Sequence, residues 1–209
     1  NPSIPRGLGR SYGDPAQIDK GFVIDLINFN KLTLDNEKGT LIAGGGAKFS
    51  DILNYIVPKG YFLPVSPGTK NITVGGAIAS DIHGKNHHCD GSFADHILKI
   101  SLIDGNGKLR ILSPFDESTS SLFWATAGGM GLTGVIVESE FQLIPITSSL
   151  MKVTTQKFDD LDSLMLSMTE NDKHFRYSVA WIDSLSKKGR GIITKGNHAD
   201  SKDLKLSKK

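Results

Sequence analysis

The sequence predicts an α+β fold in which a glycine-rich first region precedes a glycine-poor second region. Glycine accounts for 23 of the 209 residues, about 11% against a typical ~7%. Twenty of these glycines lie from Gly7 to Gly134, and the other three are Gly189, Gly191 and Gly196. Short strands between turns are predicted in the first region, and the order strand, helix, strand, strand in the second. We therefore expect two regions with different roles, the first with backbone in close or unusual conformations.

Residues 1–145 are predicted to form mainly short strands between glycine turns. Phe49–Val57 has the apolar spacing of a helix, and Ser50 or Asp51 is expected to cap its start. Asp104–Gly107 is typical of a tight hairpin turn. The other predicted elements are strands at 22–26, 40–43, 99–103, 108–112 and 134–144 and a short helix at 118–127.

Residues 146–209, after Pro145, have a different sequence pattern from the first region. Asp159–Glu170 is predicted to be an amphipathic helix with two aspartates at its positive end. Strands are predicted at 151–155, 176–182 and 191–194, so this region is expected to be the opening of an α+β sheet. The lysine-rich segment 201–209 is expected to be a loop or frayed end. The apolar face of the helix is predicted to consist of Leu161, Leu164, Met165 and Met168.

Composition excludes several classes of protein. Lys plus Arg is 24 and Asp plus Glu is 22, and a net charge of +2 is too balanced for a nucleic-acid-binding protein. A single cysteine, Cys89, excludes an internal disulfide and a cysteine-based zinc cage. No apolar stretch approaches the ~20 residues of a membrane span. Because residues 1–5 are neither a signal peptide nor an initiator start, we expect the chain to begin inside a longer polypeptide.

The first of three glycine-bearing segments is Arg6–Asp14. Its alternate glycines allow backbone N–H groups to converge on one anion, while Ser11 adds a hydroxyl and Arg10 adds charge. The segment is neither a phosphate-binding P-loop nor a complete dinucleotide fingerprint, because Tyr12 stands where the third glycine would be. The alternative is an ordinary glycine-rich surface turn.

The second segment is Ser66–Gly84 and the third is Trp124–Ile136. From Gly75 to Ser80 every side chain except that of Ile78 is very small, so either a flat ligand lies against the main chain or a helix packs tightly. The third segment is also compatible with an ordinary helix-to-strand turn. Three such segments without a nicotinamide or P-loop motif indicate a large dinucleotide held mainly by backbone.

These motifs resemble the PCMH-type FAD-binding domain of the vanillyl-alcohol-oxidase-like flavoenzymes, and within it the decaprenylphosphoryl-β-D-ribose 2'-oxidase-like group. The likeness covers essentially the whole chain and is most specific over residues 68–93. It implies two α/β subdomains in residues 1–145 and the beginning of an α+β substrate domain in 146–209. The family's domain normally starts with a further strand–helix unit and ends in a larger substrate domain. The chain is therefore expected to be a fragment, with an exposed sheet edge prone to association.

The resemblance implies FAD as the cofactor, with its pyrophosphate in the first glycine-bearing segment (the first loop) and its isoalloxazine ring beside residues 80–83. Many relatives carry a covalently attached histidine after the second glycine of this loop, where this sequence has Arg10, so the FAD is expected to be dissociable. The implied cofactor contacts are Arg6, Gly7, Leu8, Gly9, Arg10, Ser11, Tyr12, Gly13, Asp14, Pro67, Gly68, Thr69, Thr73, Val74, Gly75, Gly76, Ser80, Asp81, Ile82, His83, Gly84, Asn86, Gly131 and Ile136.

His83 is the implied catalytic residue, either accepting the substrate's hydroxyl proton or orienting the substrate. Lys85 is the second, and together with Asn86 it is expected to hold a phosphate or sugar hydroxyls. The alternatives are that His83 only hydrogen-bonds the flavin or backbone, or that the base comes from a region beyond this chain. No metal is expected at His83, His87, His88 and Cys89, because Gly84 interrupts the helical spacing and no carboxylate pattern completes a site. Cys89 is not expected to form a flavin link.

The resemblance implies oxidation of a secondary sugar hydroxyl to a ketone, with the sugar on a polyprenyl-phosphate carrier. A short-chain reductase as partner would complete an epimerisation in cell-wall or polysaccharide biosynthesis. One alternative is an alditol or sugar-lactone oxidase that uses oxygen, and another is an inert FAD-binding module. The expected location is the cytoplasm or the membrane periphery, with no nucleic acid as partner.

Overall fold

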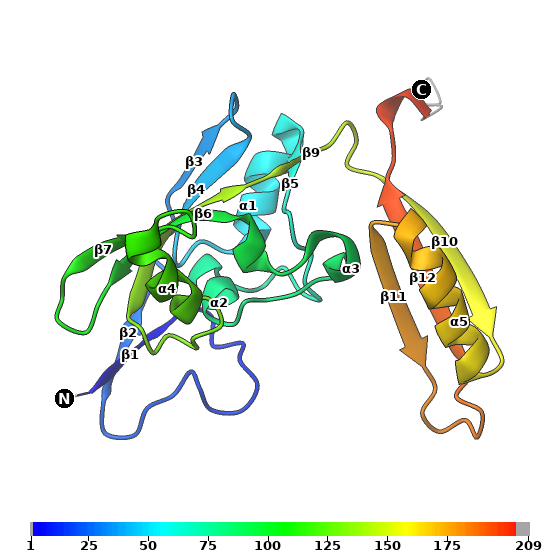
Figure 1. Ribbon diagram of the computed structural model, residues 1–209, viewed down its shortest axis with the longest axis horizontal. Coiled ribbons are helices and arrows are strands. Elements are labelled where there is room, and N and C mark those ends of the chain that lie inside the picture. Colours follow the sequence, from blue (N-terminus) through cyan, green and yellow to red (C-terminus); the bar gives the residue numbers. More distant parts are fainter. Residues whose placement is uncertain (1, 204–209) are drawn as a thin grey trace.

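The computed structural model describes residues 2–203, which form two sheet-and-helix bodies joined after β9 (Figure 1). The larger body is built on a five-stranded antiparallel sheet in the order β3-β4-β8-β6-β7. Its strands are β3 (Leu32–Asp35), β4 (Thr40–Gly44), β6 (Ile97–Ile103), β7 (Leu109–Leu112) and β8 (Val135–Gln142).

One face of this sheet packs against helices α1 (Phe49–Ile56), α2 (Val74–Ala79) and α4 (Glu117–Thr126). The core between them is closed by aromatic contacts, since the rings of Phe49 and Phe141 each lie about 5 Å from that of Phe93 (5.4 and 5.2 Å between centroids). Buried and more exposed side chains alternate along much of β6 and β8, and the buried ones form the sheet side of this core. The layer therefore holds α2 rigidly over the sheet.

Short elements surround this layer. β1 (Ser3–Arg6) and β2 (Phe22–Asp25) form a parallel pair, and β5 (Tyr61–Phe62) pairs with β9 (Ile144–Pro145). α3 (His87–Asp90) lies at the side of the larger body that faces the second sheet (Figure 1). Single 3₁₀ turns occur at Val57–Lys59, Phe93–His96, Asp172–His174 and Ser201–Asp203.

The second body is a three-stranded antiparallel sheet in the order β10-β12-β11, with one helix on one face (Figure 1). Its elements are β10 (Met151–Phe158), α5 (Leu161–Asn171), β11 (Tyr177–Ile182) and β12 (Gly191–His198). The predicted order strand, helix, strand, strand is confirmed. The boundary at residue 145 between two domains stays a prediction, and the predicted tail beyond Asp203 lies outside the described residues.

The predicted cap of α1 was wrong. α1 begins after Lys48 without a side-chain cap, because its first amides donate to backbone: Phe49 N to Ile72 O and Ser50 N to Lys70 O, each 3.0 Å. Ser50 and Asp51 instead lie in the first turn. In α5 the expected apolar face is only partly buried, since Leu164 is 1% exposed and Met165 is 57% exposed. A three-stranded sheet covers a narrower stripe of the helix than its sequence provides.

Candidate cofactor site

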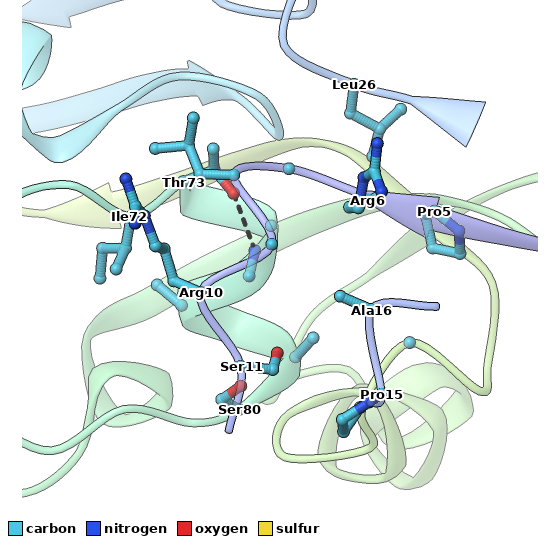
Figure 2. Close-up of a pocket in the computed structure, with 18 of the residues that line it drawn as sticks. Pro5, Arg6, Arg10, Ser11, Pro15, Ala16, Leu26, Ile72, Thr73 and Ser80 are labelled. Atoms are coloured by element: carbon cyan, nitrogen blue, oxygen red, sulfur yellow. Dashed lines mark hydrogen bonds between the residues drawn. The ribbon is translucent and has the colours of Figure 1, made fainter. Parts of the chain in front are cut away.

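A cavity of about 420 Å³ lies where the first loop (residues 6–14), α2 and the turn after α4 meet. Figure 2 shows the first loop running past α2, with Thr73 and Ser80 marking the two ends of that helix. The cavity is lined by Pro5, Arg6, Gly7, Leu8, Gly9, Arg10, Ser11, Tyr12, Pro15, Ala16, Leu26, Gly45, Ile72, Thr73, Gly75, Gly76, Ala77, Ala79, Ser80, Ile82, Met130, Gly131, Gly134 and Ile136.

The first loop leaves its backbone donors open. Among the residues that the structure describes, none accepts a hydrogen bond from the backbone amides of Leu8–Gly13. The loop is anchored just before this stretch, where Leu26 N donates to Arg6 O at 3.0 Å. Gly9 and Gly13 have φ of +60° and +69°, a conformation that favours glycine. Successive free N–H groups beside two exposed arginines form a concave donor set suited to a pyrophosphate.

The surroundings of α2 explain why this helix consists mainly of small residues. Its Gly75 side packs against the β4–α1 turn, where Gly75 N donates to Gly45 O at 2.8 Å and a methyl group at Gly75 would stand 3.0 Å from that oxygen. Its other side carries Thr73, Gly76 and Ser80, which line the cavity. Both sequence interpretations therefore apply to this one helix, which packs tightly against the β4–α1 turn and also lines the cavity.

The third glycine segment closes over the carboxyl end of α2. Gly128 N donates to Ile78 O at 3.0 Å, and Met130 N donates to Ala79 O at 2.8 Å. Gly128, Met130 and Gly131 all have φ between +53° and +80°. The Ser80 hydroxyl reaches the Met130 sulfur at 3.9 Å. This turn is thus a built wall of the cavity and brings Met130 and Gly131 to its lining.

Asp81 ends α2 in a conformation uncommon for a residue with a side chain, with φ of +37°. Its carboxylate accepts hydrogen bonds from Ser92 Oγ at 2.8 Å and Ala94 N at 2.9 Å. Phe93 N donates to Ile82 O at 2.9 Å, so the chain after α2 is held on both sides. Asp81 thereby fixes the direction in which residues 82–86 leave the cavity.

The structure brings most of the implied cofactor contacts together, but not all of them. Fourteen of the 24 line the cavity. The remaining ten do not: Gly13, Asp14, Pro67, Gly68, Thr69, Val74, Asp81, His83, Gly84 and Asn86. The amide of Asn86 is wholly engaged within the protein, since Nδ2 donates to Pro64 O at 2.6 Å and to Asp90 Oδ2 at 2.7 Å while Oδ1 accepts from Ser66 N at 3.1 Å. Its side chain therefore has no free group for a ligand.

His83 and Lys85 are both exposed and follow directly after the cavity residue Ile82. The His83 ring meets the His87 ring edge-on, with 5.8 Å between centroids. His88 Nε2 lies 2.9 Å from Phe175 O, and the Cys89 thiol reaches the same carbonyl at 3.7 Å. In the described part of the chain, no group of three or more His, Cys, Asp or Glu side chains is placed to hold a metal ion.

Sequence reasoning missed ten lining residues: Pro5, Pro15, Ala16, Leu26, Ile72, Gly45, Ala77, Ala79, Met130 and Gly134. Most are apolar or small residues whose role depends on which segments meet in space. Gly134 had a signal, since it belongs to the third glycine segment; its φ is +147° and a methyl group there would stand 2.3 Å from Ile103 O. Gly45 likewise belongs to a run of three glycines that begins with the last residue of β4.

The residues present fit a flavin dinucleotide. Free amides of the first loop suit the pyrophosphate, and a wall of glycine, alanine and serine lets a planar ring approach the backbone. At Gly7 a methyl group would stand 2.2 Å from Thr73 Oγ1, so the loop approaches the Thr73 side chain more closely than a residue with a side chain could. These features define a cavity for a large ligand held chiefly by main chain.

Comparison with known proteins agrees with this geometry. A family model described as an FAD binding domain matches residues 1–113, and the chain belongs to this family. The chain is 39% identical to a decaprenylphosphoryl-β-D-ribose oxidase of Mycolicibacterium smegmatis, over 98% of the chain and 46% of that protein. It is 40% identical to an uncharacterised protein of Streptomyces coelicolor, over 71% of the chain and 40% of the relative. It is 29% identical to the berberine bridge enzyme-like 25 protein of Arabidopsis thaliana, over 79% and 29%.

The predicted resemblance and FAD as cofactor are therefore confirmed. The chain spans about half the length, or less, of the curated relatives it matches. None of the helices among residues 2–203 has the length and apolar character needed to cross a membrane.

Proposed function

We propose that this chain provides the FAD-binding part of an oxidoreductase that oxidises a secondary hydroxyl of a sugar carried on a polyprenyl phosphate. The observation that carries the proposal is the glycine-lined cavity with the free amides of Leu8–Gly13 at its edge. Bound FAD would supply the acceptor for the substrate's hydride at its N5 atom. The substrate class is taken from the likeness to the mycobacterial oxidase.

The chain's own residues divide the remaining work. Amides of the first loop and the charges of Arg6 and Arg10 hold the pyrophosphate. Gly76 and Ser80 leave one side of α2 flat for the ring. His83, exposed just outside the cavity lining, accepts the hydroxyl proton as the carbonyl forms, and Lys85 holds the substrate's phosphate. A short-chain reductase acting on the resulting ketone would complete an epimerisation.

Cofactor binding is tested by titrating the purified chain with FAD and following quenching of flavin fluorescence. Gly76→Leu should weaken FAD binding about tenfold or more, because the new side chain enters the cavity from an exposed helix position while leucine is itself a good helix former. Thr169→Leu on the exposed side of α5 is the matched control and should bind FAD like the unaltered chain. Equal affinity of both variants would contradict the placement of FAD against α2.

The same complex tests the covalency of the flavin. By the family resemblance, Arg10 stands where many relatives have a histidine linked to the flavin, and it lines the cavity. Cys89 is directed at Phe175 O and is not among the lining residues. Acid precipitation should therefore release the flavin into the supernatant, whereas a yellow pellet would overturn the proposal.

The role of His83 is tested by reduction of the flavin on mixing with substrate. His83→Ala should slow substrate-driven bleaching ~10²-fold, the scale of general acid–base catalysis, while FAD affinity is retained. His87→Ala is the neighbouring control and should have a small effect. Unchanged bleaching in His83→Ala would remove His83 from the chemistry. Hydrogen peroxide release with free alditols would instead favour an oxygen-using oxidase.

A further inference from the structure

Residues 84–90 connect the cofactor side of the molecule to the second sheet. They follow the cavity residue Ile82 and run into α3, which faces β11 (Figure 1). Their backbone is bonded on both sides, since Lys85 N donates to Ser66 O at 3.0 Å and Ser178 N of β11 donates to Lys85 O at 2.9 Å. The Lys85 peptide is therefore held between the two bodies.

Arg176, the residue before β11, makes a two-point ion pair across this boundary. Its Nε donates to Asp90 Oδ2 and its Nη2 donates to Asp90 Oδ1, each at 2.8 Å. The pair is well shielded, with side-chain exposures of 33% for Arg176 and 15% for Asp90. A planar guanidinium that donates two hydrogen bonds to one carboxylate fixes the orientation of the two groups as well as the distance between them. A lysine ammonium would not fix their orientation.

The contact continues inward through Asn86. Asp90 Oδ2 also accepts a hydrogen bond from Asn86 Nδ2 at 2.7 Å, and Asn86 is fully buried. Asn86 in turn holds the backbone of Pro64 and Ser66. Arg176, Asp90 and Asn86 thus form a continuous polar network, named here the Arg176 network, that ends next to Lys85. Hydrogen-bonded networks that are at least partly shielded from water couple the positions of their members.

We propose that Arg176 is a positioning residue that acts through Asp90 and Asn86 to set the placement of His83 and Lys85 between the cavity and the second sheet. This inference rests on the proposed function, because it assigns to the network the orientation of the two proposed catalytic side chains. The second sheet thereby determines the geometry of a segment that belongs to the FAD-binding body. Neither partner of the ion pair lines the cavity, so its effect on FAD affinity is expected to be small.

The first experiment needs no turnover. The side-chain ¹H–¹⁵N resonances of His83, identified by their loss in His83→Ala, are compared in the unaltered chain, Arg176→Gln and Arg176→Lys, each with FAD added. The spectra are recorded at a temperature at which every variant is folded. Both Arg176 variants should shift the His83 resonances, Arg176→Gln more than Arg176→Lys. The control is Arg190→Gln, which removes an ion pair of similar length (Nε to Asp183 Oδ2, 2.9 Å) in the connection between β11 and β12 and should leave them in place.

The second experiment measures coupling. Arg176→Gln should slow substrate-driven flavin reduction about 10- to 100-fold with FAD affinity within twofold, the scale expected when reacting groups are misplaced. In the His83→Ala background the same change should have a clearly smaller effect, because only the placement of Lys85 is then left to lose. Independent, additive losses would overturn the proposal, as would unshifted His83 resonances in folded Arg176→Gln. If the unaltered chain oxidises no sugar, the proposed function fails, and the resonance comparison still decides the positioning role. Arg176→Lys serves if Arg176→Gln does not fold.

Discussion

Gly45 shows how a single residue can be essential for the site without offering a functional group. It is buried in the turn between β4 and α1, its carbonyl oxygen accepts a hydrogen bond from the Gly75 amide, and it lines the cavity. A methyl group at this position would stand 2.1 Å from Ile136 O, which is backbone of a central strand and cannot rotate away. The absence of a side chain is thus required by the approach of three segments.

Gly45→Ala should lower the free energy of unfolding by about 1–3 kcal/mol, the usual cost of overpacking a core. Denaturation with urea, read by circular dichroism, measures the change. Gly105→Ala in the β6–β7 hairpin is the control, since nothing lies within 4 Å of a methyl group there, and its effect should stay within about 0.5 kcal/mol. An equally small effect at Gly45 would show that β4 and β8 can separate without cost.

At the scale of an element, α5 depends on a side-chain cap that α1 lacks. Asp160 precedes α5 and accepts hydrogen bonds from Ser163 N at 2.8 Å and Ser163 Oγ at 3.0 Å. These bonds, first that from the backbone amide, hold the pKa of the Asp160 carboxyl below its usual value. The charged form is favoured in the folded state, so the stabilisation is present above the unfolded pKa of about 3.9.

Stability from this cap should be lost as the pH falls through the lowered pKa of folded Asp160. Asp160→Asn keeps a competent cap but does not ionise. The difference in Tm between the unaltered chain and Asp160→Asn should therefore be largest near neutral pH and shrink below about pH 3.9. Thermal unfolding over this range measures it, and a difference independent of pH would assign the cap's effect to hydrogen bonding alone.

At the scale of the whole molecule, His198 lies at the contact between the second sheet and the larger body. Its ring meets Phe62 edge-on at 4.9 Å between centroids, and its Nε2 lies 3.0 Å from the Tyr177 hydroxyl. Burial, and then the charge of Arg176, lower the pKa of His198 below its usual value. Burial also raises the pKa of Tyr177, so the pair stays neutral near pH 7.

Contact between the two bodies should weaken in mild acid. Neutral His198 contributes stability that is complete above its unfolded pKa of about 6.5 and is lost as the pH falls through the lower folded pKa. Between pH 7.5 and 5 the Tm of the unaltered chain should therefore fall more than that of His198→Gln, which keeps an acceptor for Tyr177 without titrating. Parallel Tm curves would show that protonation of His198 does not act at this contact.

Local patterns determined most of the elements. The hairpin around Asp104–Gly107, the helix after Lys48 and the strand–helix–strand–strand order of the second body follow from turn residues and apolar spacing. β1, β3 and β5 were not predicted; each has four residues or fewer, too few to establish a strand pattern with certainty in a single sequence. The apolar face of α5 was predicted, but its sequence did not show that Met165 stays exposed, because burial depends on how wide a partner surface the sheet offers.

By itself, the sequence predicted that the first region binds a large dinucleotide through its backbone, because glycine spacing and small residues act through local conformation. It also indicated FAD and the participation of residues 6–14 and 73–82. Only the tertiary structure decided that Leu26 and Met130 complete the cavity, that Asn86 is consumed by internal hydrogen bonds and that Arg176 pairs with Asp90. Those contacts join residues up to 86 positions apart, and local sequence carries no signal for which distant segments meet.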